Sequence, residues 1–210
     1  MGDIPLAVVT ATIWTYWIAV GAMVARLRRK THKMVGVIPE QRVEKFMWLA
    51  FVPMVVAWMT VPILAMRTHG PFAIGSVVQE ITWYATLRWV AAIVAVVALA
   101  ATAKCWARMG KAWRMDVSTS QPTELITDGL FTRIRHPIYA FSIVLMLATL
   151  AIVPTWPMLI VAVVHNVLMN LKARNEERHL LATQGEAYRR YFMSTGRFFP
   201  HLFRRGAWRQ

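Results

Sequence analysis

The chain has 210 residues, of which 57% are hydrophobic, and it contains ten tryptophans and thirteen methionines. Water-soluble domains of this size rarely carry so much apolar surface, so the composition predicts a membrane protein with several spans. The formal net charge of +14 comes from segments between and after the apolar runs, which is typical of inner-side membrane loops and argues against nucleic-acid binding. The single cysteine, Cys105, excludes an internal disulfide and a cysteine-based zinc cluster.

Three apolar runs in the first half of the chain are long enough to cross a bilayer, namely Ile4–Ala25, Phe46–Met66 and Ile81–Ala103. The basic cluster RLRRKTHK that follows the first run predicts a cytoplasmic loop and an N-terminus outside. Arg88 is the only charge inside the third run, and we expect it to snorkel to the outer surface. Residues 1–103 are therefore predicted to form three spans of a single membrane domain, 1–210.

The second half, residues 104–210, begins with a polar segment and continues into two short apolar arms, Ile138–Val153 and Trp156–Leu171, joined by the turn sequence VPTWP. Each arm would be about 24 Å long at 1.5 Å per residue, which is short for a full crossing. A basic amphipathic helix is predicted over roughly Ala173–Ser194, lying at the cytoplasmic membrane surface. The predicted fold is an all-α integral membrane protein with about five transmembrane helices, the last two a short hairpin, and no Rossmann domain.

The stretch TRIRHPIYAF gathers cationic groups where the first arm begins. Pro137 suits the first position of a helix, which places His136 near the N-cap. The free backbone N–H groups of that helix end, together with Arg133 and Arg135, would suit an anion such as a carboxylate or phosphate. The alternative is that these residues only mark the cytoplasmic end of a span.

A polar stripe begins inside the second arm. At 3.6 residues per turn, Asn166, Asn170, Arg174 and Glu177 fall on one face of a helix. Such a stripe is costly in an apolar hairpin, so it indicates either a ligand site or hydrogen bonds between helices.

Both arms of the hairpin end on the same side of the membrane, so the arginine–histidine corner and the stripe are expected to lie close together. The arginine–histidine corner would offer donors for an anion. Glu176 and Glu177 would offer carboxylates for a hydroxyl or an ammonium. This combination favours a zwitterionic cofactor. His165, His179 and His201 are scattered, and we interpret them as structural or surface residues; no metal site is predicted.

Three segments carry a resemblance to a known family: MGKAWRMDV (Met109–Val117), TELITDGLFTRIRHPIYAF (Thr123–Phe141) and NEERHLLATQGEAYRRYFMSTGRFFP (Asn175–Pro200). In these segments the chain resembles the isoprenylcysteine carboxyl methyltransferase family and the related phospholipid N-methyltransferases. The resemblance covers about residues 105–200, and the combination of RHPxY, a short apolar hairpin and an EExxL–GxxYxxY tail is specific. Phe141 departs from the pattern, because many relatives have a small residue there.

The resemblance implies that S-adenosylmethionine binds at the cytoplasmic ends of the last helices. The implied cofactor-binding residues are Leu125, Thr127, Gly129, Arg135, His136, Pro137, Tyr139, Glu176 and Glu177. Arg174 and Glu177 are the predicted catalytic residues, and Asn166, Asn170 and Arg174 are predicted to contact the acceptor.

The predicted function is S-adenosylmethionine-dependent methylation of a lipophilic or lipidated acceptor in the bilayer, foremost O-methylation of an isoprenylcysteine-type carboxylate. A carboxylate is already ionised at neutral pH and needs no base. Methylation of a phospholipid, amine or thiol is an alternative that would need Glu177 or His136 as the base. A non-catalytic membrane scaffold or transporter subunit is the other alternative.

Overall fold

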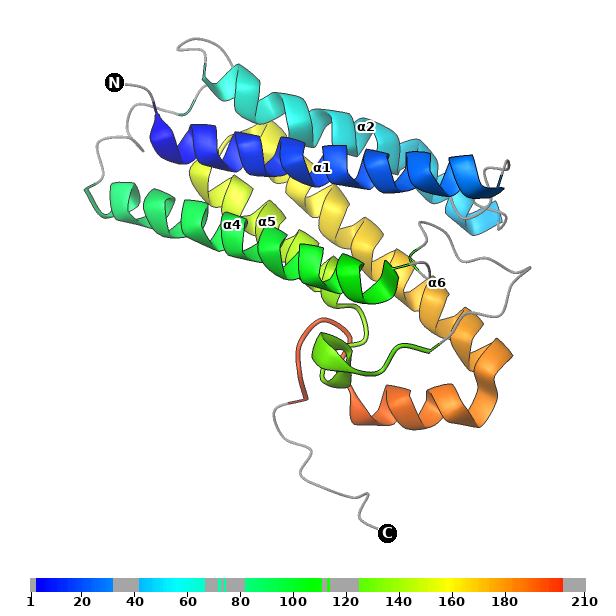
Figure 1. Ribbon diagram of the computed structural model, residues 1–210. Coiled ribbons are helices and arrows are strands. Elements are labelled where there is room, and N and C mark those ends of the chain that lie inside the picture. The colour runs from blue at the N-terminus through cyan, green and yellow to red at the C-terminus, as the bar shows by residue number, and fades with distance from the viewer. Residues whose placement is uncertain are drawn as a thin grey trace.

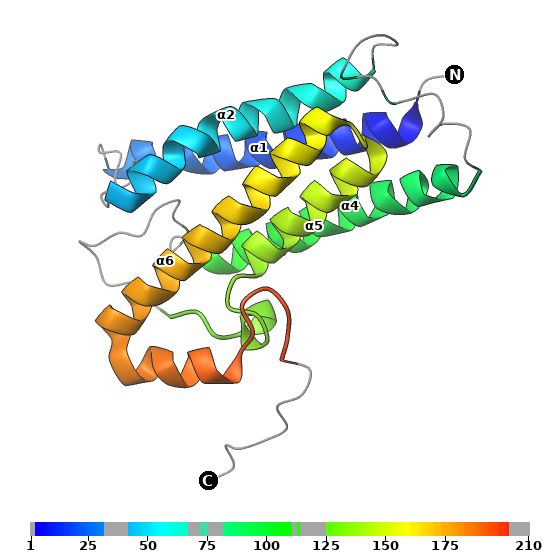
Figure 2. The ribbon, with the colours of Figure 1, turned by 180° about the vertical axis from the view of Figure 1, so that it is seen from behind.

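The computed structural model describes residues 3–31, 42–66, 72, 74, 82–110, 113 and 125–201, and almost all of them are helical. The helices are α1 (Ile4–Thr31), α2 (Arg42–Ala65), α4 (Thr82–Met109), α5 (Pro137–Ile152) and α6 (Trp156–Ser194), with a short 3₁₀ helix, η2 (Gly129–Thr132). Figures 1 and 2 show α1 and α2 side by side, α4 beside α5, and α6 running obliquely across the bundle to emerge at one end.

Four of these helices, α1, α2, α4 and α6, are long and apolar enough to cross a membrane, and α5 is a shorter apolar helix. Each of the apolar runs in the sequence forms a helix because hydrocarbon leaves backbone polar groups no other partner. The predicted fold class, an all-α integral membrane protein, is confirmed. That α5 and α6 are both transmembrane helices stays a prediction.

The bundle packs in the manner of membrane proteins, with small residues inside and large apolar residues outside. Along α4 the buried positions include Ala91, Ala95 and Ala98, whereas Ile93 and Val97 are 62% and 59% exposed. Small side chains let neighbouring helix backbones approach closely, and the exposed aliphatic side chains suit contact with lipid. Cys105 is buried on the same helix, as expected for a packing residue.

Polar contacts tie the helices together inside the apolar bundle. Trp58 Nε1 of α2 donates to Thr149 Oγ1 of α5 over 3.3 Å, and the Tyr84 hydroxyl of α4 donates to the Ile152 carbonyl over 3.1 Å. Arg88, the one charge in the third predicted span, forms an ion pair with Asp3, just before α1. The sequence predicted that Arg88 would reach an interface but not that an acidic partner would meet it there.

The last helix continues through the boundary between its apolar and polar parts. The second arm and the predicted tail helix form a single element, α6, which ends at Ser194 as expected. Its path bends at Gly185, where φ is 53° and ψ is −126° (Figures 1 and 2). The predicted turn before α6 is also present, and Thr155 caps the helix by accepting from Met158 N. The bend turns the final helical segment back beneath the bundle.

Gly185→Ala should lower the thermal midpoint of the protein in detergent, because φ of 53° with ψ of −126° lies in a region that glycine enters readily and that costs an L-residue about 1–3 kcal/mol. A Cβ at Gly185 would meet no atom within 4 Å, so the loss would report backbone strain rather than a clash. Gly21→Ala is the matched control, since Gly21 lies within α1 and also has open space around it. The control should be neutral or stabilising by about 0.5–1 kcal/mol; equal effects of the two substitutions would contradict the account of the bend.

Candidate active site

A short backbone pairing joins the segment after α6 to the segment before α5. Arg135 N donates to the Gly196 carbonyl over 2.8 Å, Gly196 N donates to the Arg133 carbonyl over 3.1 Å, and His136 N donates to the Arg197 carbonyl over 3.1 Å. Gly196 is required here, because a Cβ would lie 1.7 Å from the Phe199 carbonyl oxygen. The chain after the last helix is thereby fixed against the arginine–histidine corner.

The carboxylate of Glu177 lies at the centre of this junction. Arg135 Nε donates to its Oε1 over 3.0 Å, and Arg197 contacts its Oε2 through Nε at 3.1 Å and Nη2 at 2.5 Å. The Glu177 and Arg135 side chains are only 4% and 6% exposed. A buried carboxylate with two guanidinium partners satisfies the rule that buried charges are paired.

Arg135 is held on its other side as well. Its Nη1 donates to the Phe192 carbonyl over 2.8 Å and also to the Thr195 carbonyl, and its guanidinium lies 4.1 Å from the centre of the Phe192 ring. Arg135 therefore connects the start of α5, the middle of α6 and the end of α6. This rigid arrangement fixes the direction of the neighbouring His136.

The charges of the cluster shift its pKa values. Burial alone would raise the pKa of Glu177, but His136, Arg197 and Arg135 outweigh that effect and lower it to about 2. Burial alone would lower the pKa of His136, but Glu176 and Glu177 raise it above its usual value. His136 Nδ1 lies 3.5 Å from Glu176 Oε2, and its Nε2 lies 3.4 Å from Glu177 Oε1. The imidazolium and both carboxylates are thus stabilised in their charged forms.

Glu176 points away from this buried cluster. Its side chain is 34% exposed, and its Oε2 accepts a hydrogen bond of 3.1 Å from the Tyr139 hydroxyl. The Tyr139 ring stacks on His136 with 5.3 Å between the ring centres and 6° between the planes. Burial would raise the pKa of Glu176, but His136 and Lys172 lower it. Glu176 therefore presents an ionised carboxylate beside an aromatic face.

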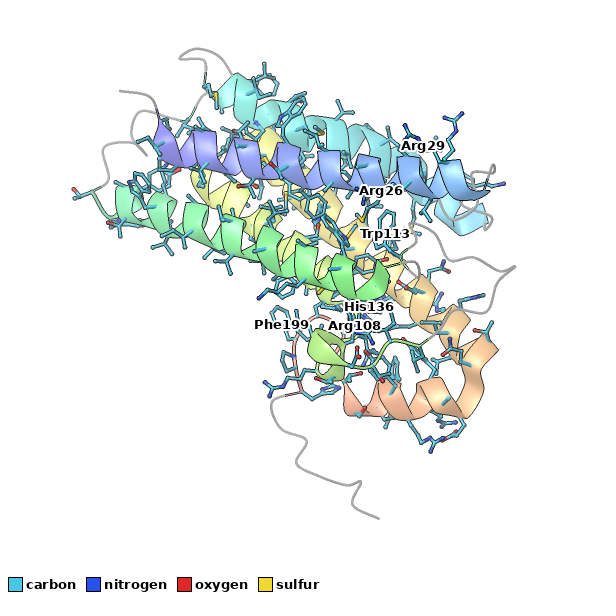
Figure 3. The ribbon with its side chains drawn as sticks, in the orientation of Figure 1. Arg26, Arg29, Arg108, Trp113, His136 and Phe199 are labelled. Carbon is cyan, nitrogen blue, oxygen red and sulfur yellow. The ribbon has the colours of Figure 1, made fainter. Side chains whose placement is uncertain are left out.

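A pocket of about 510 Å³, open at its mouth, lies beside Glu176. It lies between the end of α4, the segment around η2, the start of α5 and the second half of α6. Figure 3 shows His136 and Arg108 at this end of the bundle. The lining residues are Met109, Leu125, Ile126, Phe131, Arg135, His136, Glu176, Leu180, Gln184, Tyr188 and Tyr191. Mostly apolar walls with a few convergent polar groups are usual for small-molecule and cofactor sites.

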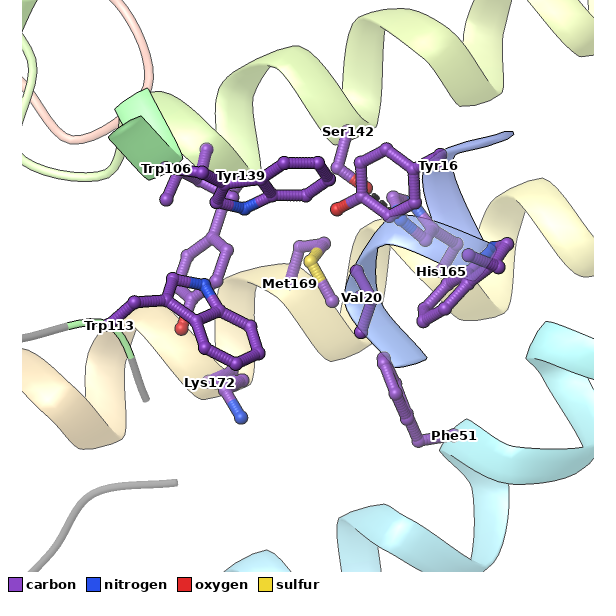
Figure 4. A pocket seen from close by; sticks show the side chains of 12 residues that line it. Tyr16, Val20, Phe51, Trp106, Trp113, Tyr139, Ser142, His165, Met169 and Lys172 are labelled. Carbon is purple, nitrogen blue, oxygen red and sulfur yellow. Dashed lines mark hydrogen bonds between the residues drawn. The ribbon is translucent and has the colours of Figure 1, made fainter. Parts of the chain in front are cut away.

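A second cavity, with about 540 Å³ of empty space and likewise open at its mouth, lies between the helices on the other side of Tyr139 (Figure 4). Aromatic side chains from α1, α2 and α4 surround it, and among the described residues Lys172 of α6 is the one charged side chain that lines it. The Tyr139 side chain lines this bundle cavity and donates its hydroxyl hydrogen to Glu176, which lines the first pocket. The Tyr139–Glu176 hydrogen bond therefore forms part of the wall between two adjacent binding spaces.

The structure brings together most of the residues predicted to hold the cofactor. Leu125, Arg135, His136 and Glu176 line the pocket. Pro137 is buried at the first position of α5, with His136 as its N-cap, as the sequence predicted. Thr127 and Gly129 lie in the neighbouring segment and are exposed.

The predicted acceptor residues lie elsewhere on α6. Asn166 and Asn170 donate to carbonyls of their own helix, those of Ala162 and Asn166, over 2.8 and 3.1 Å. Arg174 is exposed, whereas Glu177, predicted on the same stripe, is buried. The three predicted acceptor residues, Asn166, Asn170 and Arg174, line neither of the pockets described above. Their contact with an acceptor stays a prediction.

Two residues with important contacts were not singled out from the sequence. Arg197 is one of the two arginines that pair with Glu177, and Tyr188 is a buried residue in the wall of the pocket. Both lie in the segment NEERHLLATQGEAYRRYFMSTGRFFP that carried the family resemblance. An arginine twenty positions after its partner gives no periodic signal, because the contact depends on the bend at Gly185.

Comparison with protein families supports the sequence interpretation. Residues 90–182 match the model of the Isoprenylcysteine carboxyl methyltransferase (ICMT) family, so the predicted family resemblance is confirmed over that part of the chain. The match includes α5, the arginine–histidine corner and both glutamates, and it indicates a membrane methyltransferase. A search of curated proteins found no significant match.

Glu177→Gln should destabilise the protein by about 3 kcal/mol, because it leaves two guanidinium groups near an uncharged partner. The folded-state pKa of Glu177 is about 2, below its ordinary value of 4.5, so its contribution is complete above pH 4.5 and is lost between pH 4.5 and about 2. The difference in thermal midpoint between wild type and Glu177→Gln should therefore shrink as the pH falls through this window. Glu186→Gln, an exposed change on the same helix, is the control. A difference in thermal midpoint between wild type and Glu177→Gln that does not change with pH would contradict the ion pairing of Glu177.

Proposed function

We propose that the protein is an integral membrane methyltransferase that binds S-adenosylmethionine in the pocket beside Glu176 and takes a lipophilic acceptor in the bundle cavity. The observation that carries this proposal is the shared wall: Tyr139 lines one space, and its hydrogen-bond partner Glu176 lines the other. A methyl transfer requires donor and acceptor to meet in line. Two adjacent cavities, one at the polar end of the bundle and one inside its apolar part, place donor and acceptor side by side, and the in-line transfer needs the Tyr139–Glu176 hydrogen bond between them to open.

The pocket beside Glu176 suits the cofactor in its chemistry. Apolar side chains such as Leu125, Phe131 and Leu180 can pack on a nucleoside base, and Glu176 can accept from ribose hydroxyls or pair with the ammonium group. His136 Nε2 is buried, lies 3.4 Å from Glu177 Oε1 and makes no well-aligned hydrogen bond within the described part of the chain. When bound, the cofactor supplies an electrophilic methyl group on a sulfonium. The residues of this chain bind, orient and shield the two partners.

Among the possible acceptors, we favour an isoprenylcysteine-type carboxylate, which would be O-methylated. Lys172 lines the bundle cavity and supplies a positive charge for an anionic group there. An ionised carboxylate needs no general base, so the protein has to position it and exclude water. Positioning of this kind can supply about 7–11 kcal/mol of the barrier.

The state of Glu177 argues against acceptors that must lose a proton. A carboxylate with a pKa of about 2 and two arginine partners is a weak proton acceptor at neutral pH, and efficient bases have pKa values near the working pH. We therefore assign Glu177 a positioning role: it fixes Arg135 and His136 at the edge of the cofactor pocket. Amine or thiol methylation, for which Glu177 was one predicted base, is correspondingly less favoured.

We further propose that this end of the protein faces the cytoplasm and that the N-terminus lies outside. Figure 3 shows Arg26, Arg29 and Arg108 gathered at the same end as His136. Basic residues concentrate on the cytoplasmic side of membrane proteins. A non-catalytic scaffold or transporter subunit would not need two adjacent cavities at this end, so the cavities favour the enzyme.

Calorimetry in detergent with S-adenosylhomocysteine tests cofactor binding without requiring an acceptor. The wild type should bind, and Glu176→Ala should bind about tenfold or more weakly, since hydrogen bonds to charged groups are worth about 1.5–3 kcal/mol. Glu186→Ala, on the exposed side of the same helix, should bind like the wild type. No binding by a folded wild-type protein would remove the enzyme proposal.

Membranes containing the protein, incubated with methyl-labelled cofactor, test the acceptor. We expect the label in an apolar product that releases volatile methanol on mild alkaline treatment, as a carboxyl methyl ester does. Lys172→Met, which removes the cation of the bundle cavity while keeping an unbranched side chain, should reduce this product even at saturating cofactor. Label in an alkali-stable phospholipid headgroup or in a thioether would contradict the carboxylate assignment.

A further inference from the structure

We propose that the bundle cavity recognises a second, neutral polar group of the acceptor through Trp17 and His165, about 10 Å from the end marked by Lys172. The acceptor would then be an amphiphile with a carboxylate at one end and a hydroxyl or carbonyl group part-way along its apolar chain. This inference rests on the proposed function, since it concerns the acceptor of the same site.

The cavity has the composition of a selective binding site. Its lining comes from five helices and from Trp113: Tyr16, Trp17, Val20, Phe51, Trp106, Trp113, Ile138, Tyr139, Ser142, His165, Met169 and Lys172. Figure 4 shows Tyr139, Trp113 and Lys172 towards one end, and Tyr16, Ser142 and His165 towards the other. The cavity thus has polar groups at both ends and apolar side chains such as Val20 and Met169 between them.

Two buried polar atoms without partners belong to residues that line this one cavity. Within the part of the chain that the structure describes, Trp17 Nε1 and His165 Nδ1 make no hydrogen bond. The His165 side chain is almost fully buried, and its other nitrogen, Nε2, lies 3.0 Å from Ser142 Oγ. The two remaining atoms of this kind, Arg88 Nε and His136 Nε2, belong to ion-paired residues already described.

An unpaired polar atom inside an apolar bundle is costly, about 1–3 kcal/mol each. Two such atoms, on side chains that line one cavity, therefore favour a ligand that displaces neighbouring side chains slightly and pairs with them. Trp17 Nε1 can only donate, so the ligand group must accept a hydrogen bond. His165 Nδ1 can accept or donate depending on its tautomer, which suits a hydroxyl or a carbonyl. No charged residue lines this end of the cavity among the described residues, so the group is neutral.

The spacing along α6 sets the length of the acceptor. His165 and Lys172 are seven positions apart on one helix, and seven positions rise about 10 Å. An extended polypeptide advances about 3.3–3.6 Å over the three backbone bonds of a residue, which is about 1.2 Å per bond. At the same advance per bond, roughly eight bonds separate the carboxylate of the acceptor from its second polar group. The cavity therefore distinguishes acceptors by the position of a polar group as well as by apolar length.

A neighbouring space offers a way in for the rest of an apolar tail. A smaller pocket of about 300 Å³ is lined by Met47, Trp48 and Leu168, and it shares Phe51, Met169 and Lys172 with the bundle cavity. These residues come from α2 and α6. Close to them on α2, Phe46 and Leu49 are each 74% exposed, as is usual for side chains that face lipid. A tail longer than the cavity can leave between α2 and α6.

A matched pair of probes tests the inference: octanoic acid and 8-hydroxyoctanoic acid, titrated calorimetrically into the full-length protein in detergent with S-adenosylhomocysteine present. The quantity compared is the ratio of the two dissociation constants, so that partition of each probe into micelles cancels between variants. Relative to the wild type, Trp17→Phe and His165→Leu should each reduce the preference for the hydroxylated probe by about fivefold, the value of one hydrogen bond of about 1 kcal/mol. Phe51→Leu, in the same cavity but without a polar group, should leave the ratio unchanged.

The outcomes separate this inference from the proposed function. Unchanged ratios in both variants, with cofactor binding intact, would overturn the recognition of a second polar group and leave the methyltransferase proposal standing; a water molecule would then satisfy the two atoms. A reduced ratio in a protein whose wild type does not bind S-adenosylhomocysteine, measured with the probes alone, would support the cavity assignment and remove the enzyme proposal. Trp17→Phe keeps an aromatic side chain while removing the N–H donor. It therefore still tests the inference if His165→Leu does not fold.

Discussion

The buried carboxylate of Glu177 determines how the polar end of this protein is assembled. It pairs with Arg135, which precedes α5 and is buried, and with Arg197, which follows α6 and is partly exposed. Removing a charge from such a cluster leaves its partners uncompensated, so the three segments are strongly coupled. The backbone pairing between Arg135 and Gly196 reinforces the same junction. Because of this arrangement, His136 is held in a fixed orientation against Tyr139 and Glu176.

The pocket beside Glu176 and the bundle cavity lie on the two sides of the Tyr139–Glu176 hydrogen bond, next to this junction. One has mostly apolar walls with a few polar groups and lies at the polar end of the bundle, and the other lies between its apolar helices. Under the proposed function, a water-soluble cofactor and a lipid-soluble acceptor would each be taken from the phase in which they dissolve. Tyr139 and Glu176 would then stand between the two. This division explains why charged residues concentrate at one end while the rest of the bundle is apolar.

The sequence was sufficient to predict the helices and the proximity of His136 to Glu177. Long apolar runs in a membrane have few structural alternatives to helices, and a short hairpin returns both of its ends to one side, which placed His136 near Glu177. Contacts that depend on a bend or on a chain end were not predictable in this way. Arg197 reaches Glu177 only because α6 turns at Gly185, and Asp3 meets Arg88 only because α1 and α4 begin side by side.

His165 shows a further limit of reasoning from a sequence. A single histidine on an apolar helix carries no pattern, so it was interpreted as structural, and only the structure reveals that one of its nitrogens makes no hydrogen bond to the described residues and that its side chain lines a cavity. The polar stripe on α6 shows the reverse. The segment is helical, but Arg174 is exposed while Glu177 is buried, and Asn166 and Asn170 donate to carbonyls of their own helix, which periodicity alone cannot show.

The central claim is that one cofactor pocket and one acceptor cavity meet at the Tyr139–Glu176 hydrogen bond. The most direct measurement is an experimental structure of the protein bound to S-adenosylhomocysteine in a lipid environment. The account predicts the ligand in the pocket lined by Leu125, His136 and Glu176, with the bundle cavity open on the other side of Tyr139. A ligand bound at another surface, or one separated from Tyr139 by intact helices, would contradict it.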